Sequence, residues 1–347
     1  MTDLKSLTFP ELEKFALSKG FKKYRAVQIA RWLYKKLATD FDQMTDISKE
    51  DREKLKKEAK IYNLKILKKE QSSDGTVKYL FELEDGNRIE SVFIPERDWN
   101  TICISTQVGC PVGCAFCLTA KDGFTRNLKV SEIVDQYISV QRDVGTERRI
   151  SNIVFMGMGE PLLNFENLKK SIEILTDDRM LGLSTRKITV STCGIIPGIK
   201  RMAKELPKIK LALSLHATDD KTRKRLIPLN ERYPINEIMK ELRKYPANNV
   251  RRIMVEYLIM EGINDSIEDA KRLIKLVKGI PVKINIIPFN EYPGSPFKRP
   301  SREKIEAFQK VLWDAGIATF IRDSRGQDIS AACGMLRAKE SADKTTI

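Results

Sequence analysis

The stretch Gly109-Cys-Pro-Val-Gly-Cys-Ala-Phe-Cys117 brings three cysteines together within eight residues, in the spacing C-x3-C-x2-C. A structural zinc site closes with four ligands, and a four-iron cluster is normally held by four cysteines. Three thiolates from one loop therefore leave one coordination position open to a substrate or cofactor. Gly109 and Gly113 supply the tight backbone that a loop around a cluster requires. We therefore predict a metal centre that takes part in chemistry.

A structural zinc site is the alternative interpretation of this loop, with Cys103 as its fourth ligand. Cys103 lies seven residues before Cys110 and inside a predicted strand, which is an awkward position for a ligand of the same loop. We therefore rank this interpretation below an open site held by Cys110, Cys114 and Cys117.

Outward from the loop, strand and helix patterns alternate from residue 100 onward. The predicted strands span 101–106, 152–156, 187–191, 210–215, 253–259, 283–288 and 318–322. The predicted helices span 131–143, 165–176, 197–205, 234–244, 267–278 and 301–314. This alternation indicates an α/β fold with a parallel sheet and outer helices, in about six units that form a partial (β/α)6 barrel. Functional residues are then expected at the C-terminal ends of the strands.

The chain before residue 100 has a different pattern. Residues 1–64 are predicted to form a small helical domain, in which Val27, either Ala30 or Arg31, and Tyr34 lie at helical spacing with basic residues between them. Residues 65–99 alternate between apolar and polar side chains around Asp85-Gly86, which predicts a β-hairpin. We therefore divide the chain into the helical domain, the hairpin extension at 65–99, the barrel at 100–335 and a frayed tail at 336–347.

The charge balance favours a polyanionic partner. The chain has 62 Lys and Arg against 47 Asp and Glu, a formal net charge of +15, which is typical of a nucleic-acid-binding protein. We see neither a membrane span nor a secretory signal, and expect a cytoplasmic protein. In a reducing compartment, its six cysteines indicate metal ligands or redox-active thiols and exclude a disulfide framework.

A second motif, Gly157-Met-Gly-Glu-Pro161, follows the second predicted strand of the barrel. Its glycines allow a ligand to approach the backbone closely, and Glu160 can accept hydrogen bonds from an ammonium group. Together with the three-cysteine loop, this motif resembles the radical S-adenosylmethionine (SAM) superfamily. The resemblance implies a 4Fe-4S cluster on Cys110, Cys114 and Cys117. It also implies that the amino and carboxylate groups of SAM bind the open iron, and that the bound cofactor yields a 5′-deoxyadenosyl radical.

Further motifs narrow the match. They are 28–34, 103–110, 123–128, 155–164, 214–217 and 326–334. Spread over nearly the whole chain, they resemble the RlmN/Cfr family of RNA adenine methyltransferases, and Gly159-Glu-Pro-Leu162 with Ala331-Ala-Cys-Gly334 favours its RlmN branch. The resemblance implies methylation at C2 of an adenosine in 23S rRNA and of adenosine 37 in tRNA. The Cfr branch, which methylates C8, is the alternative.

The resemblance also implies roles for individual residues. C2 of adenine is too electron-poor to attack a sulfonium methyl group, so the family uses a relay that consumes two SAM molecules. Cys333 takes the methyl group, a radical on that methyl group adds to C2, Glu90 accepts the C2 proton, and Cys103 forms a disulfide with Cys333 to release the RNA. The residues that match SAM contacts are Gly159, Glu160, Ser191, Ser214, Leu215, His216 and Asn290.

Other expectations are less specific. His216, the single histidine, is not expected to act as a base, and Cys193 stands where the family often has serine. Candidate RNA contacts are the N-terminal helices and Lys121, Arg126 and Lys129. We expect a monomer that receives electrons from a flavodoxin or ferredoxin type of donor, and a target adenine flipped out of its fold. The rival class is a non-catalytic RNA-binding protein with a structural zinc.

Overall fold

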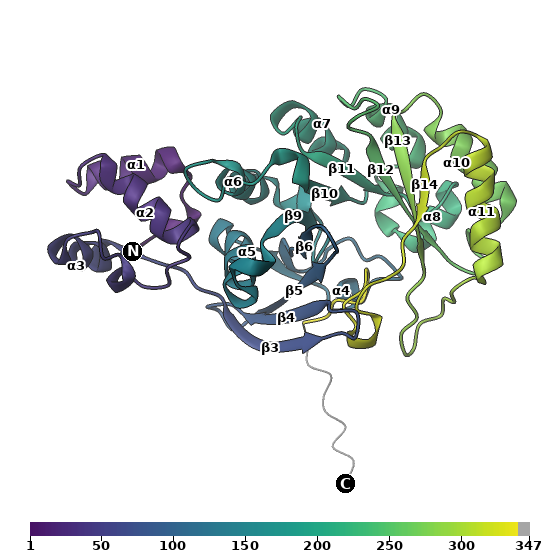
Figure 1. The fold of residues 1–347 in the computed structure, drawn as a ribbon. Coiled ribbons are helices and arrows are strands. Elements are labelled where there is room, and N and C mark those ends of the chain that lie inside the picture. Colours follow the sequence, from purple (N-terminus) through teal and green to yellow (C-terminus); the bar gives the residue numbers. More distant parts are fainter. Residues whose placement is uncertain (339–347) are drawn as a thin grey trace, which may run out of the picture.

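The computed structural model describes residues 1–338 and centres on one ten-stranded sheet, in the order β14-β13-β12-β11-β10-β9-β6-β5-β4-β3. Seven strands are parallel and follow one another across the sheet in chain order (Figure 1). They are β6 (Asn100–Cys103), β9 (Ile150–Phe155), β10 (Ile188–Thr192), β11 (Lys210–Ser214), β12 (Ile253–Ile259), β13 (Val282–Pro288) and β14 (Thr319–Ile321). Within the described residues β14 and β3 are the two edges, so the predicted partial barrel is confirmed.

Helices connect successive parallel strands and cover the outside of the sheet. They are α5 (Val130–Val144), α6 (Phe165–Thr176), α7 (Ile196–Glu205), α8 (Asp220–Leu226), α9 (Ile235–Leu242), α10 (Ile267–Val277) and α11 (Arg302–Asp314). The sequence of α10 explains its docking, because Ala270, Leu273 and Val277 lie on one face and are buried. The strand β12 is buried along its whole length, as expected for a parallel strand covered on both sides.

The observed elements lie close to the predicted ranges, with two informative differences. The strand predicted over 101–106 ends at Cys103, because the Gln136 side chain hydrogen bonds to both main-chain groups of Ser105 (2.8 and 3.0 Å). Unpredicted elements frame the cysteine loop, namely α4 (Leu118–Lys121), β7 (Gln107–Gly109), β8 (Phe124–Asn127) and α8. Short 3-10 helices are η1 (Leu4–Ser6), η2 (Phe41–Gln43), η3 (Thr146–Arg148), η4 (Pro161–Asn164), η5 (Thr185–Lys187), η6 (Pro228–Glu231) and η7 (Gln327–Ile329).

The predicted hairpin is present and extends the central sheet. Its strands β4 (Val77–Glu82) and β5 (Arg88–Pro95) pair antiparallel around Asp85-Gly86, where Gly86 has a φ of +78°. A further strand, β3 (Lys65–Gln71), pairs with β4, and β5 pairs antiparallel with β6. The hairpin and the parallel strands therefore share one hydrogen-bonded sheet.

The N-terminal part is helical, with α1 (Phe9–Ser18), α2 (Tyr24–Tyr34) and α3 (Lys49–Glu58) beside a two-stranded sheet of β1 (Thr2–Asp3) and β2 (Ala59–Lys60). The helix α2 buries Ala26, Ile29 and Leu33, whereas Val27 is 49% exposed. The predicted apolar face was therefore wrong at Val27. The buried stripe begins one residue earlier and follows the spacing i, i+3, i+7.

The segment after β14 returns to the hairpin and the cysteine loop (yellow in Figure 1). Ser72 Oγ donates to Asp328 Oδ1 (2.6 Å), and Leu118 N donates to the carbonyl oxygen of Gly334 (2.8 Å). Leu336 and Arg337, which the sequence placed in a frayed tail, also have partners. Thr119 Oγ1 donates to the carbonyl oxygen of Leu336 (2.7 Å), and Arg337 N donates to Glu90 Oε2 on the hairpin strand β5 (2.7 Å). Residues 339–347 of the predicted tail lie outside the described part of the chain.

A buried ion pair joins the N-terminal part to the barrel. Lys5, in η1, pairs with Asp135 of α5, and both side chains are inaccessible to solvent. Asp135 also accepts hydrogen bonds from Leu64 N (2.6 Å) and Ser139 Oγ (3.0 Å), and Lys5 Nζ donates to Asn63 Oδ1 (3.2 Å). Burial lowers the pKa of Lys5 although Asp135 opposes this shift.

Among residues 1–338 no helix has the length and apolar character needed to cross a membrane.

We predict that Asp135→Ala lowers the free energy of unfolding by about 3–5 kcal/mol, because it leaves the ammonium group of Lys5 buried and unpaired. Urea denaturation measures the effect. Asp314→Ala is the matched control, since it removes an exposed i,i+4 pair with Lys310 and is expected to cost at most about 1 kcal/mol. Equal losses in the two variants would contradict the structural role of the buried pair.

Candidate active site

A pocket lies where the parallel strands end, and it gathers most of the predicted site residues. It contains about 970 Å³ not occupied by protein atoms, part of it open to solvent. The predicted residues that line it are Cys110, Cys114, Cys117, Gly159, Glu160, Ser191, Ser214, His216 and Cys333. Their positions on separate strand ends agree with the functional face of a (β/α) barrel.

The cysteine loop is held by main-chain contacts. Cys110 N donates to the carbonyl oxygen of Gly123 (2.8 Å), and Ala115 N donates to that of Leu226 (2.9 Å). Gly109 has a φ of +72°, and a Cβ there would lie 1.9 Å from the Gly123 oxygen, so no other residue fits. Burial raises the pKa of the three thiols, that of Cys110 to about 12. In the described residues no group of three or more His, Cys, Asp or Glu side chains is already arranged to hold a metal ion.

Gly157 and Gly159 have a packing role that the sequence did not reveal. A Cβ at Gly157 would lie 2.8 Å from the Ile104 carbonyl carbon, and one at Gly159 would lie 2.6 Å from Gln107 Cβ. Gly159 also has a φ of +102°. The glycines thus let the turn after β9 pack against the segment after β6, while the opposite side of the turn borders the pocket.

Glu160 is buried and fixed in the wall of the pocket. Its main-chain N–H donates to Gln107 Oε1 (2.8 Å), and its carboxylate accepts hydrogen bonds from Leu162 N (3.0 Å) and Cys193 N (2.8 Å). Burial raises its pKa, although these hydrogen bonds favour the ionised form. A carboxylate held in this way is oriented before any ligand arrives.

Ser191 lies near the end of β10 and Ser214 is the last residue of β11, which Leu215 and His216 follow. Ser191 Oγ donates to the carbonyl oxygen of Phe155 (2.8 Å), and Leu215 is buried outside the pocket lining. His216 adopts a φ of +58°, and its Nδ1 accepts a hydrogen bond from Leu258 N (3.0 Å). Burial lowers the pKa of His216 to about 3, and the positive charge of Arg223 contributes a smaller part of this shift. The imidazole is therefore neutral at physiological pH.

Arg223, in α8, is the most informative residue that sequence reasoning missed. Its side chain is inaccessible to solvent, and its guanidinium donates to the carbonyl oxygens of Leu215 (2.9 Å), Cys193 (2.6 Å) and Ser214 (3.1 Å). A fourth bond goes to Asn230 Oδ1 (3.0 Å). Within residues 1–338 no carboxylate lies at ion-pair distance from this group. Burial lowers its pKa. A lone Arg in a basic segment gave no sequence signal.

Cys103 and Cys333 lie close enough to influence each other. Cys103 is buried at the end of β6, and both thiols are free. Burial and the charge of Cys333 raise the pKa of Cys103. Cys333 borders the pocket. The residue as a whole is exposed, but desolvation of its thiol, together with Glu256 of β12, raises the pKa of that thiol to about 11. Glu256 lines the same pocket, and its Oε1 accepts a hydrogen bond from Asn285 Nδ2 (2.8 Å).

Glu90, on β5, is buried beside the C-terminal segment. Its Oε2 accepts the hydrogen bond from Arg337 N (2.7 Å), and its Oε1 lies 3.4 Å from Lys78 Nζ. Burial outweighs these two contacts and raises the pKa of Glu90 to about 7. Glu90 is not among the residues that line the large pocket.

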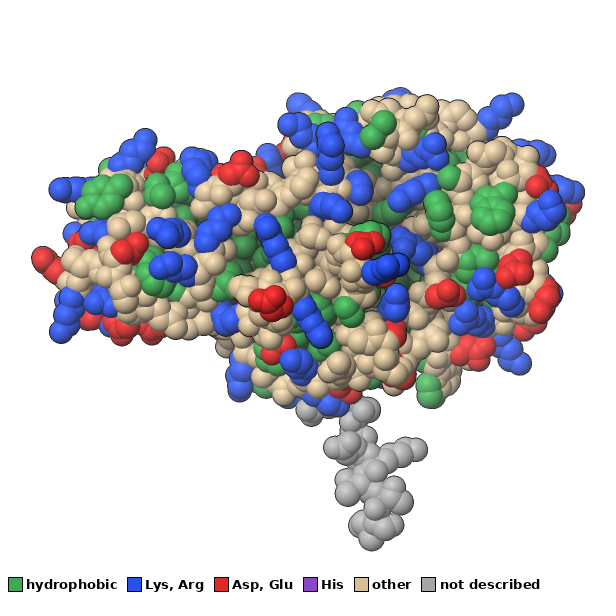
Figure 2. Space-filling model, in the orientation of Figure 1, with side chains coloured by type: hydrophobic (Ala, Val, Ile, Leu, Met, Phe, Trp, Pro, Cys, Tyr) green, Lys and Arg blue, Asp and Glu red, His purple; other side chains and the backbone are tan. Residues whose placement is uncertain are grey.

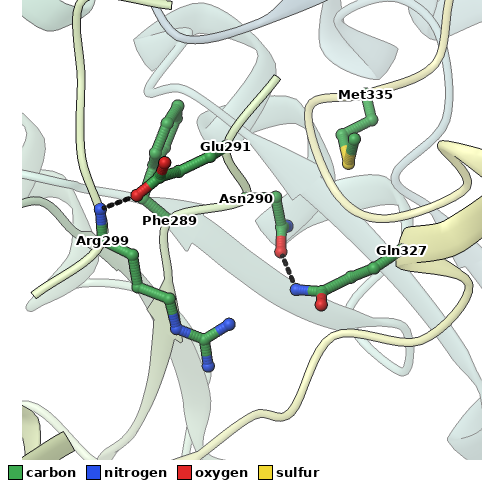
Figure 3. A pocket seen from close by; sticks show the side chains of 6 residues that line it. All are labelled: Phe289, Asn290, Glu291, Arg299, Gln327 and Met335. Carbon is green, nitrogen blue, oxygen red and sulfur yellow. Dashed lines mark hydrogen bonds between the residues drawn. The ribbon is translucent and has the colours of Figure 1, made fainter. Parts of the chain in front are cut away.

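Asn290 lines a different, neighbouring pocket (Figure 3). Its Nδ2 donates to the carbonyl oxygen of Cys333 (3.3 Å), and its Oδ1 accepts from Gln327 Nε2 (2.7 Å). The structure therefore places Asn290 against Cys333 but outside the group of predicted SAM contacts.

The basic side chains that are candidate RNA contacts differ in how many contacts they make within the protein. Arg126 is committed within the protein, because Nε donates to Asp85 (2.6 Å) and its two terminal nitrogens donate to Glu132 (2.8 and 2.9 Å). Lys121 Nζ lies 4.7 Å from the ring centre of Tyr292, and Lys129 is exposed. Figure 2 shows Lys and Arg side chains spread over one face, from the N-terminal helices to the barrel. Arg126 would therefore have to share its guanidinium with Asp85 and Glu132 in any contact with RNA.

Comparisons with known proteins place two regions of the chain in described families. Residues 2–61 match the ribosomal RNA large subunit methyltransferase N-terminal domain, and residues 104–277 match the radical SAM superfamily. A crystal structure of a radical SAM methyltransferase from Sphaerobacter thermophilus is 43% identical, with a TM-score of 0.94, over 98% of this chain and 100% of that one. The fold and the site thus define a radical SAM methyltransferase.

Curated relatives narrow this class. The dual-specificity RNA methyltransferase RlmN of Pelobacter propionicus is 50% identical over 98% of this chain and 97% of its own length. The probable dual-specificity RNA methyltransferase RlmN of Aquifex aeolicus is 47% identical over 96% of both chains. The chain belongs to the RlmN family of RNA methyltransferases.

We predict that Gly159→Ala weakens SAM binding at least tenfold, because the added methyl group displaces the turn that holds Glu160. Equilibrium dialysis with reconstituted protein measures the affinity. Gly262→Ala is the matched control, since Gly262 also has a positive φ (+66°) but has no neighbour within 4 Å of a Cβ. Wild-type affinity in Gly159→Ala would show that the close contact with Gln107 does not position the site.

Proposed function

We propose that this protein methylates C2 of an adenosine in 23S rRNA and of adenosine 37 in tRNA. One observation carries the proposal. Cys333, on the C-terminal segment, borders the same pocket as the three-cysteine loop and Glu160, and its charge contributes to the raised pKa of Cys103. A methyl-carrying thiol, a resolving thiol and a cluster loop in one place support transfer to a carbon that ordinary displacement cannot methylate. The relatives' name, dual-specificity RNA methyltransferase, supports more than one RNA substrate, and the match to a ribosomal RNA large subunit methyltransferase domain supports a ribosomal one.

The residues around the pocket fit the cofactors of the radical SAM superfamily. Cys110, Cys114 and Cys117 would hold the 4Fe-4S cluster, and thiolates are the usual ligands of such clusters. Glu160, buried and with its carboxylate fixed by two N–H donors, suits an ammonium group of SAM. Ser191, Ser214 and His216 border the same space. When bound, these cofactors supply the methyl group and a 5′-deoxyadenosyl radical.

In the proposed reaction, two cysteines carry and release the methyl group, and two buried basic side chains hold the site in place. Cys333 holds the methyl group as a thioether and afterwards links it to C2 of the adenine. Cys103, as thiolate, attacks the sulfur of Cys333 and breaks the bond between that sulfur and the linking carbon. The two sulfurs form a disulfide, and the carbon takes up a proton to become the methyl group of the released RNA. The buried position of Cys103 keeps its thiol protonated and away from other oxidants until this exchange. The neutral His216 and the buried Arg223 hold the strand ends in place and exclude water.

Glu90 is the proposed acceptor of the C2 proton. Its pKa of about 7 places the carboxylate close to the operating pH, which suits a general base. The contact with Arg337 ties it to the segment that carries Cys333. A second contact, with Lys78, keeps the carboxylate from being fully neutralised by burial.

We propose a helical RNA-binding domain at 1–64, a hairpin extension at 65–99, a barrel at 100–335 and a tail from 336, in a cytoplasmic monomer. The basic surface supports RNA binding. A flavodoxin or ferredoxin type of protein would supply the electron, and each methyl transfer would consume two SAM molecules.

Nucleoside analysis tests the function. RNA from cells with the gene is expected to contain 2-methyladenosine in both 23S rRNA and tRNA, which mass spectrometry separates from 8-methyladenosine. A strain with Cys333→Ala is the control and should yield neither product. Detection of 8-methyladenosine alone would establish the alternative C8 activity and overturn the proposal.

We predict that single-turnover methylation of RNA rises with pH and reaches half of its maximum near pH 7, because Glu90 must be ionised to accept a proton. Glu90→Gln is expected to slow this step by about 10²–10⁴-fold and to remove that limb of the profile. Glu70→Gln is the matched control, since Glu70 shares Lys78 with Glu90 (3.2 and 3.4 Å). The Glu70 charge raises the pKa of Glu90, so this control should move the midpoint to slightly lower pH. An unchanged profile in Glu90→Gln would assign the proton to another base.

A further inference from the structure

A second pocket opens beside the candidate active site, at the end of β13. It contains about 510 Å³ not occupied by protein atoms, part of it open solvent. The lining residues come from three places in the chain, namely the end of β13, the loop before α11 and the C-terminal segment. They are Phe289, Asn290, Glu291, Arg299, Gln327 and Met335. No role assigned above uses this pocket as a whole.

Two hydrogen bonds connect the second pocket to the backbone of Cys333. Gln327 donates to Asn290, and Asn290 donates to the carbonyl oxygen of Cys333 (2.7 and 3.3 Å). Met335 follows Cys333 by two residues and lines the pocket (Figure 3). A group held in this pocket therefore lies next to the thiol that carries the methyl group.

Arg299 supplies an available positive charge. Its main-chain N–H donates to Glu291 Oε1 (2.9 Å), which fixes the backbone and leaves the guanidinium free. In Figure 3 the guanidinium extends away from Glu291, on the side of the pocket that faces Gln327. Within residues 1–338 no ion pair or hydrogen bond involves this guanidinium. Arg302, three residues later, instead pairs with Glu306 (2.6 Å) and Asp323 (3.6 Å).

The other walls suit a nucleobase. Phe289 is buried in an aromatic group with Tyr292 and Phe297, at ring-centre distances of 6.1 and 5.8 Å. Met335 offers a polarisable thioether, which packs well against flat rings. The amide oxygen of Gln327 accepts no hydrogen bond from the described residues, so it remains available to an exocyclic amino group. A guanidinium, an amide and apolar surface are the elements that bind a nucleotide of single-stranded RNA.

We propose that this second pocket binds one nucleotide of the substrate RNA next to the target adenosine, with its phosphate at Arg299 and its base against Met335 and Gln327. The proposal rests on the proposed function and adds a substrate site to it. Holding a neighbouring nucleotide would keep the strand in the extended form that a flipped-out target requires. The link through Asn290 would align that strand with Cys333.

The test compares Arg299→Gln with Arg302→Gln. Binding of a tRNA by reconstituted protein without reductant is measured at several salt concentrations, so that no turnover occurs. Arg299→Gln should raise the Kd several-fold and lower the slope of log K against log salt by about 0.7, the value for one phosphate contact on a single strand. Arg302→Gln should leave both close to wild type. Iron content and the thermal midpoint report whether each variant is folded.

Gln327→Ala adds an uncharged variant. It should weaken RNA binding while leaving the salt slope unchanged, because it removes a base contact and no phosphate contact. Wild-type affinity and slope in Arg299→Gln would overturn the inference, as would equal losses in Arg299→Gln and Arg302→Gln. These results are separable from the proposed function. Protein that yields 2-methyladenosine while Arg299→Gln binds RNA normally would refute the second pocket alone.

Discussion

The guanidinium of Arg223 holds the carboxyl ends of β10 and β11 together, and the rim of the candidate active site depends on it. A buried cation without a carboxylate partner is costly unless its donors are satisfied. Here three main-chain carbonyl oxygens and Asn230 accept four hydrogen bonds from its five N–H donors. Cys193 is shared, because its carbonyl oxygen accepts from Arg223 while its N–H donates to Glu160. Two buried charges therefore set the position of one short segment between them.

This arrangement explains how several strand ends form one site. Ser191, Ser214 and His216 occupy positions close to the carbonyl groups that Arg223 binds, so their backbone is fixed before a ligand arrives. The left-handed conformation of His216 is uncommon for a non-glycine residue. Two hydrogen bonds stabilise it, one from Leu258 N to His216 Nδ1 (3.0 Å) and one from Asn264 Nδ2 to the His216 carbonyl oxygen (2.8 Å). Buried hydrogen bonds from Arg223 hold the rim. The C-terminal segment is held in another way, mainly by contacts to the hairpin and the cysteine loop.

Much of the fold and part of the site were predictable from sequence, and the failures have physical causes. Alternating patterns located the parallel strands, because each strand and helix carries its own periodicity. Tertiary contacts decided the rest. Gln136 ends β6 early, and the buried stripe of α2 excludes Val27. The sequence motifs predicted that Cys333 would lie near the cysteine loop. The position of Asn290 could not be predicted, because it depends on a hydrogen bond to the carbonyl oxygen of Cys333, 43 positions away.

The anchored C-terminal segment has a consequence for biosynthesis. Its contacts join residues 217 to 256 positions apart, among them Thr119 with Leu336, Arg337 with Glu90, and Ser72 with Asp328. Chains emerge N-terminus first, and contacts of such long separation form only once both partners are available. While the last residues of a nascent chain are still inside the ribosome, Cys333 cannot border the pocket. A chain that stops before residue 333 therefore keeps the three-cysteine loop but lacks the Cys333 thiol at the pocket.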